Sequence, residues 1–187
     1  MPYLSRHDIE LIAQRVISAY KKLPNHHGQE VDMVQPDLLV CGMLGLSVEH
    51  HTLSRSGKIL GLTSCGAVDV QIFDKSEGPE YYHLDGKTLL IDSCLQAENA
   101  NKGRYNFTLI HEACHQIYRM LFPKEYSSII SKRKVHYCTA DSSSGDGDWE
   151  EWRTNTLASA ILMPADMVLN NMIAFGLGNE LKMLNKV

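Results

Sequence analysis

The segment from Asn106 to Leu121 constrains the fold most, because it reads as a helix and carries two histidines four residues apart. The run His111-Glu112-Ala113-Cys114-His115 fits the pattern H-E-x-x-H, and Pro123 ends the segment. Residues four apart on a helix share a face, so both imidazoles can bind one metal ion. The glutamate between them lies where a general base would act. The segment therefore predicts the helix of a zinc hydrolase, usually a peptidase.

A catalytic zinc ion takes three protein ligands, so a third ligand must come from elsewhere in the chain. The continuation H-x-x-G-x-x-H, which would supply a third histidine, is absent. The alternative is a glutamate on a later helix, and Glu151 fits it on a helix predicted from Trp149 to Met163. Glu150 and Asp148 could replace Glu151 if the helix register differs. We expect one zinc ion per chain, although two histidines and a glutamate also accept manganese.

Asn155 follows Glu151 by one helical turn and is predicted to point the same way. Its side-chain oxygen could accept a hydrogen bond from the nitrogen of His111 that does not face the metal, and so fix the tautomer of that ring. A peptidase also needs a donor that stabilises the oxyanion. Tyr118, His136 and Tyr137 are the candidates for that role.

Composition excludes several other classes of function. The chain has 187 residues, which favours a single domain over residues 1–187, and its net charge of −4 argues against a nucleic acid as the direct partner. We find no run of about 18 apolar residues and no apolar signal-peptide core near Met1, so we expect a cytoplasmic protein without a membrane span. The five scattered cysteines fit reduced thiols.

The pattern along the rest of the chain predicts an α+β fold, with a small mixed sheet packed on the motif helix and further helices at both ends. A capping box of Ser5 and Asp8 begins a first helix that runs to Leu23. Asp85-Gly86 is a strong turn signal, which predicts a hairpin between the strands on either side of it. The other predicted elements are a helix at 36–45, strands at 46–53, 58–62, 67–73, 81–84 and 87–92, a helix at 166–175 and a helix from 179.

Two segments resemble a known family. The run from Phe107 to Ile117 resembles the F-T-x-x-H-E-x-x-H segment of the ImmA/IrrE metallopeptidases, and the run from Glu151 to Pro164 resembles their E-x-x-A-N-x-F-A-x-x-L-L-M-P segment. Thr154, Leu157 and Cys114 depart from the usual Ala, Phe and Gly of the family. The resemblance is firm from about residue 106 to residue 164.

The resemblance implies a gluzincin-like fold and a zinc endopeptidase that cleaves a helix-turn-helix repressor of a mobile element or stress response. The roughly 45 residues before the first predicted strand are too few for a helix-turn-helix domain with its own core, so the repressor would be a separate protein. Gluzincins generally bind substrate along a sheet edge, and the strand ending near Asp92 is the predicted edge. The alternative function is a peptidase-fold binding module with little or no proteolysis, although an intact Glu112 argues against it.

Overall fold

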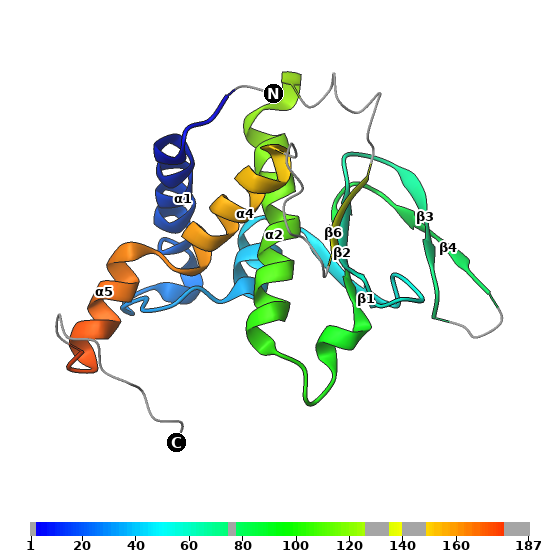
Figure 1. Ribbon diagram of the computed structural model, residues 1–187. Coiled ribbons are helices and arrows are strands. Elements are labelled where there is room, and N and C mark those ends of the chain that lie inside the picture. Colours follow the sequence, from blue (N-terminus) through cyan, green and yellow to red (C-terminus); the bar gives the residue numbers. More distant parts are fainter. Residues whose placement is uncertain (1–2, 75–77, 126–134, 140–148, 178–187) are drawn as a thin grey trace.

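The computed structural model describes residues 3–74, 78–125, 135–139 and 149–177, and its fold is α+β as predicted (Figure 1). Helices lie at both ends of the chain and a small mixed sheet lies between them in sequence. Two predicted features, Asp148 as an alternative ligand and the helix from Asn179, lie outside the described residues.

Helix α1 (Arg6–Tyr20) begins at the predicted capping box. The backbone N–H of Asp8 donates to Ser5 Oγ at 3.2 Å, and the backbone N–H of Ser5 donates to Asp8 Oδ2 at 2.9 Å. The helix ends three residues before the predicted end, at Tyr20. A 3-10 turn (Pro24–His26) and a π-helical turn (Leu38–Met43) then lead to the first strand.

The main sheet has four strands in the order β1-β5-β2-β6. Strands β1 and β5 run parallel, whereas β2 is antiparallel to both β5 and β6. Strands β3 and β4 form a separate antiparallel pair. The bounds are β1 (Ser47–His51), β2 (Ile59–Ser64), β3 (Val68–Ile72), β4 (Glu80–Leu84), β5 (Thr88–Asp92) and β6 (Val135–Thr139).

The predicted hairpin across Asp85-Gly86 is wrong, because β4 pairs with β3 whereas β5 enters the main sheet. The turn itself exists: Asp85 Oδ1 accepts hydrogen bonds from the backbone N–H groups of Lys87 at 2.7 Å and Thr88 at 2.9 Å, and Gly86 has a φ of 82°. A turn signal predicts a chain reversal but not the partner of the next strand. Every residue of β5 is buried, which favours a central position in a sheet covered on both faces.

Strand β6 is not among the strands predicted from the sequence, and it forms the edge strand beside β2. It pairs only with β2 among the strands that the structure describes. The predicted edge strand, which ends at Asp92, is β5 and lies between β1 and β2. The edge nearest the motif helix is therefore β6, as its contacts with that helix show.

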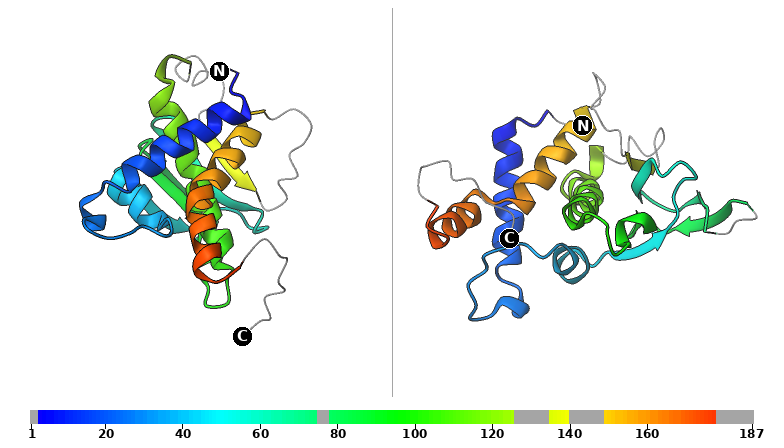
Figure 2. Two further views of the ribbon diagram at one scale, coloured as in Figure 1. Left: turned by 90° about the vertical axis from the view of Figure 1, so that its left-hand side faces the viewer. Right: turned by 60° about the horizontal axis from the view of Figure 1, so that its bottom comes forward.

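Helix α2 (Lys102–Leu121) carries the H-E-x-x-H motif and begins after Asn101, whose side chain accepts a hydrogen bond from the backbone N–H of Arg104 at 3.1 Å. It lies between the main sheet and α4 (Trp149–Leu162), and the right-hand view of Figure 2 looks nearly along it. All residues from Thr108 to Tyr118 are consequently buried, because the helix is covered on opposite sides. Leu121, at the end of the helix, is half exposed beyond that contact.

The main sheet separates two apolar cores. Leu89 and Ile91 of β5 pack into the larger core, which α1, α2 and α4 complete. Leu90, between them, points to the smaller core beneath β3 and β4, as the alternation of a strand requires. The sheet thus presents one face to the motif helix and the other to the β3–β4 pair.

The segment Trp149–Ala174 contains a stretch of 18 residues with a mean hydropathy of 1.4, so it is long and apolar enough to cross a membrane by length and composition. It consists of two helices, however, α4 and α5 (Ala165–Ala174), which are separated at Met163-Pro164. Helix α4 packs between α1 and α2 and has Glu150 and Glu151 in its first turn. A core helix of a soluble protein passes the same test of length and hydropathy.

Candidate metal centre

The contact between α2 and α4 brings together the three side chains predicted as metal ligands. Nε2 of His111 lies 3.2 Å from Oε2 of Glu151, and Nε2 of His115 lies 3.6 Å from Oε1 of the same carboxylate. Both histidines are buried, whereas the Glu151 side chain is 19% exposed. Potential ligand atoms of all three residues lie within 4.8 Å of one another. The structure therefore contains a buried group that could hold a metal ion.

The orientation of the two motif histidines suits one shared ion. Their ring centroids lie 5.1 Å apart and the rings are inclined by 76°. Two imidazoles bound through nitrogen at about 2.0–2.1 Å to a tetrahedral ion would place their centroids roughly 5 Å apart. Nε2 of His111 is buried and makes no hydrogen bond to a residue in the described part of the chain, so an ion would satisfy it.

A second group consists of His115, His136 and Glu150, whose potential ligand atoms also lie within 4.8 Å of one another. The rings of His115 and His136 are stacked, with centroids 4.2 Å apart and an angle of 23° between their planes. The lone pairs of stacked imidazoles run side by side, so they do not converge on one ion as those of His111 and His115 can. This geometry favours Glu151 over Glu150 as the third ligand.

Asn155 lies where the sequence predicted it, one turn after Glu151. Its Oδ1 is 2.9 Å from Nδ1 of His111, a distance at which the protonated ring nitrogen donates to the amide oxygen. That hydrogen bond places the proton on Nδ1 and leaves the lone pair of Nε2 directed at Glu151. One turn of α4 thus supplies both a candidate ligand and the group that orients the candidate ligand opposite it.

Glu112 is completely buried between α2 and the main sheet. Burial raises the pKa of its carboxyl well above the ordinary value, the negative charge of Glu151 raises it further, and the backbone N–H of Cys138 acts in the opposite direction. A carboxylate oxygen of Glu112 lies within 4.8 Å of a ring nitrogen of His111. A carboxyl beside the candidate ligands is placed to take up and release a proton.

The thiol of Cys138 belongs to the same neighbourhood, because its Sγ lies within 4.8 Å of ligand atoms of His111 and Glu112. Burial, and then the charges of Glu112 and Glu151, raise the pKa of this thiol to about 12. In the metal-free protein it is therefore a neutral thiol rather than a thiolate, which is the form that binds metals.

The three candidates for stabilising an oxyanion occupy different environments. The hydroxyl of Tyr118 is buried and donates to the backbone oxygen of Arg153 at 3.2 Å. Tyr137 lies opposite Leu62 in the β2–β6 register, on the sheet face that points away from α2. His136 is fully buried against His115, and its Nε2 lies 3.5 Å from Sγ of Cys65. The structure therefore brings only His136, of these three, to the metal ligands.

Sequence reasoning missed the part of the site that the sheet provides. Nε2 of Gln116 donates to Oγ1 of Thr63 at 2.5 Å and to the backbone oxygen of Ser64 at 2.9 Å, which fixes α2 on β2 next to His115. Gly61 of β2 contacts Glu112. The contact with Cys138 could not be predicted because no strand was predicted in its segment. A glycine inside a predicted strand, such as Gly61, does indicate a close approach.

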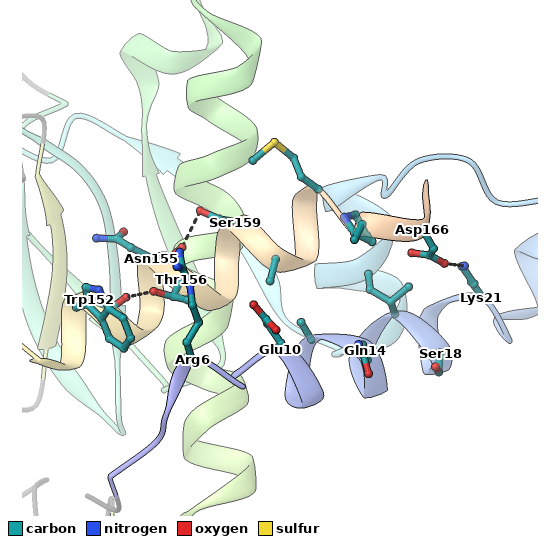
Figure 3. Close-up of a pocket in the computed structure, with 16 residues that line it drawn as sticks. Arg6, Glu10, Gln14, Ser18, Lys21, Trp152, Asn155, Thr156, Ser159 and Asp166 are labelled. Carbon is teal, nitrogen blue, oxygen red and sulfur yellow. Dashed lines mark hydrogen bonds and ion pairs between the residues drawn. The ribbon is translucent and has the colours of Figure 1, made fainter. Parts of the chain in front are cut away.

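A groove of about 1070 Å³ lies between α1 and α4, on the other side of α4 from its contact with α2 (Figure 3). Asn155 lies towards one end of it, and the ion pair between Lys21 and Asp166, 2.8 Å long, lies at the other. Its lining includes both charge signs and apolar side chains, among them Arg6, Glu10, Ile17, Trp152 and Met163. Asn155 connects the groove to the candidate metal centre, because the same side chain bonds to His111.

No protein-family model matches the chain, and no curated protein matches it. Membership of the ImmA/IrrE family therefore stays a prediction from the two sequence segments.

Proposed function

We propose that this chain is a cytoplasmic zinc endopeptidase of the ImmA/IrrE family that hydrolyses peptide bonds in a separate helix-turn-helix repressor. The observation that carries this proposal is the convergence of His111, His115 and Glu151, with the Glu112 carboxyl buried beside them. The repressor as substrate rests on the family resemblance.

Nε2 of His111, Nε2 of His115 and the Glu151 carboxylate would hold the ion. Two imidazoles and one carboxylate are a donor set that zinc takes at catalytic sites, with a further position open to water. When bound, zinc polarises a peptide carbonyl and lowers the pKa of water. Manganese remains the alternative ion for this donor set.

Residues of this chain would carry out the proton transfers and orient the ligand rings. Glu112 would take the proton from the attacking water and later give it to the leaving amine. Its burial supports this role, because a raised pKa allows the carboxyl to keep the proton between the two steps. Asn155 would hold the His111 ring in its ligating tautomer. His136 would hold the ring of His115 in place by stacking against it.

A peptidase-fold binding module with little or no proteolysis is the second candidate. The burial of the site favours it, because His111 and His115 are each only 2% exposed. Glu112 argues against it: an ionisable carboxyl that is fully buried is unfavourable for stability, and a module that only binds would lose nothing with an apolar residue there.

The test is the metal content of the purified protein by elemental analysis, with Glu151→Ala as the variant and Glu150→Ala as its matched control. We expect about one zinc per chain in the wild type and in Glu150→Ala, and a clear loss in Glu151→Ala. A wild-type protein that binds no metal even when zinc is supplied would overturn the proposal.

Glu112→Gln separates the two candidate functions. For an endopeptidase, this variant should keep its zinc and lose cleavage of a helix-turn-helix repressor. For a binding module, the variant should keep both its zinc and its effect on the partner.

A further inference from the structure

Gly61 of β2 lies so close to the side chain of Glu112 that a side chain at position 61 has no room unless a neighbour shifts. A Cβ atom at position 61 would lie 2.8 Å from Oε1 of Glu112 and 2.9 Å from its Cγ. It would also lie 2.7 Å from Cγ2 of Thr108, one turn earlier on α2. Real Cβ atoms essentially never approach a neighbour closer than 3.0 Å, so a side chain at 61 would force a shift of Thr108, of the Glu112 side chain or of the strand.

The backbone conformation does not explain this glycine. Gly61 is not among the glycines with a positive φ, so any residue could adopt its backbone angles. The requirement is space alone. A glycine inside a strand weakens the strand, so its presence there needs a reason. The reason here is the close approach of another group, which leaves room for a hydrogen atom only.

An irregularity in the strand pairing places Gly61 at this contact. Ile59 pairs with Thr139 and Gly61 with Cys138, so β2 has one more residue than β6 between these pairs, namely Leu60. Such a bulge re-aims the residues beside it and is common next to active sites. Here it sets Gly61 opposite Cys138, whose Sγ lies within 4.8 Å of a carboxylate oxygen of Glu112.

We propose that Gly61 is a positioning residue, which holds the Glu112 carboxyl in place beside the candidate metal ligands. This inference rests on the proposed function, in which Glu112 is the general base. Gly61 touches no metal ligand in this account: it leaves the room in which Glu112 lies close to His111. A methyl group at 61 should therefore move the base and leave metal binding intact.

The matched pair of variants is Gly61→Ala and Gly66→Ala. Gly66 lies five residues further along the chain, has no positive φ, and has no atom within 4 Å of an added Cβ. Both variants add one methyl group, so the difference between them isolates the contact with Glu112. Zinc content measured by elemental analysis should be the same in both variants and the wild type.

The probe for the position of Glu112 is acetohydroxamic acid, titrated into the cobalt-loaded protein and followed by visible absorption. The hydroxamic O–H proton is released when the probe binds a metal ion, and Glu112 is placed to receive it. We expect Glu112→Gln and Gly61→Ala each to weaken this binding about tenfold or more, as for the loss of a hydrogen bond to a charged group. Gly66→Ala should stay within about twofold of the wild type.

The double variant completes the test. If Gly61 acts through Glu112, then Gly61→Ala should cause no further loss of affinity in the Glu112→Gln background. Additive losses, a loss of zinc from Gly61→Ala, or a Gly61→Ala affinity equal to that of Gly66→Ala would each overturn the inference and leave the proposed function standing. If Glu112→Gln binds the probe as the wild type does, the proposed base itself is wrong.

Gly61→Ala could also fail to fold, because the added methyl meets Thr108 as well. The variant Gly61→Ala, Thr108→Ser removes the Thr108 methyl and leaves only the contact with Glu112. It should fold, keep its zinc, and show the same loss of acetohydroxamate affinity against Thr108→Ser alone. An unchanged affinity in this pair would overturn the inference.

Discussion

Nδ1 of His111 lies 2.9 Å from Oδ1 of Asn155, across the contact between α2 and α4. The opposite nitrogen of the same ring, Nε2, lies 3.2 Å from the Glu151 carboxylate. Glu151 and Asn155 are one helical turn apart, so side chains from a single turn of α4 contact both ring nitrogens of His111. A change in the register of α4 would disturb the ligand and its orientation together.

Asn155→Ala should weaken zinc binding, because it removes the acceptor that fixes the tautomer of His111. Losses of about 10- to 100-fold are typical when such a partner of a metal ligand is removed. Competition against a chromophoric chelator measures this affinity. Ser159→Ala is the control, since Ser159 lies one turn further along α4 and its hydroxyl donates only to the backbone oxygen of Asn155, at 2.9 Å. Equal affinities in the two variants would contradict the role of Asn155.

Tyr118→Phe should lower stability without affecting the site. The substitution removes the hydrogen bond to the Arg153 backbone oxygen but keeps the ring, over which the Arg153 guanidinium lies at 5.4 Å. We expect a loss of about 1 kcal/mol in the free energy of unfolding, measured with urea on the zinc-free protein. Zinc affinity should not change. A fall in cleavage rate of about 100-fold or more would instead identify Tyr118 as an oxyanion donor.

Local sequence signals predicted those parts of the fold and site that depend on one helix. The capping box of Ser5 and Asp8 correctly predicted the start of α1. The four-residue spacing of His111 and His115 correctly predicted that the two side chains share one face of α2. Glu151 and Asn155 followed from the same helical geometry on α4. Each of these predictions requires only that a segment be helical, which spacing and flanking prolines indicate well.

Strand pairing was not predictable in the same way. The Asp85-Gly86 turn is present, yet β5 pairs with β1 and β2 because its fully buried residues need a central position. Strand β6 follows a segment with no periodic pattern, so its place beside β2 depends on contacts between residues distant in sequence. Gly61 of β2 and Cys138 of β6 both lie close to Glu112, and sequence spacing carries no information about the pairing of these two strands.

The stability of the metal-free protein should depend on pH through Glu112. The ordinary pKa of this carboxyl is 4.5, and burial raises it well above that value in the folded protein. Between the two values the folded protein keeps a proton that the unfolded chain releases, so the free energy of unfolding falls as pH rises. The slope from one such group is at most about 1.4 kcal/mol per pH unit.

Glu112→Gln provides the comparison, because an amide does not titrate. The difference in the free energy of unfolding, Glu112→Gln minus wild type, should grow as pH rises above about 4.5 and level off above the folded pKa. Urea unfolding of both zinc-free proteins at several pH values measures it, and other titrating groups cancel in the difference. Two parallel curves would show that Glu112 has the same pKa in the folded and unfolded states.

Zinc should stabilise the folded protein through Glu151 and not through Glu150. At a free zinc concentration about 100 times the dissociation constant, binding to the folded state alone adds about 2.7 kcal/mol. In a domain of this size that corresponds to a rise in Tm of roughly 5–10 °C. Thermal unfolding in a zinc buffer should give this rise for the wild type and Glu150→Gln, and a much smaller one for Glu151→Gln. If Glu150→Gln instead shows the small rise and Glu151→Gln the full one, the ion is held by the group of His115, His136 and Glu150. The stacked rings of His115 and His136 must then turn so that both point a nitrogen at the ion.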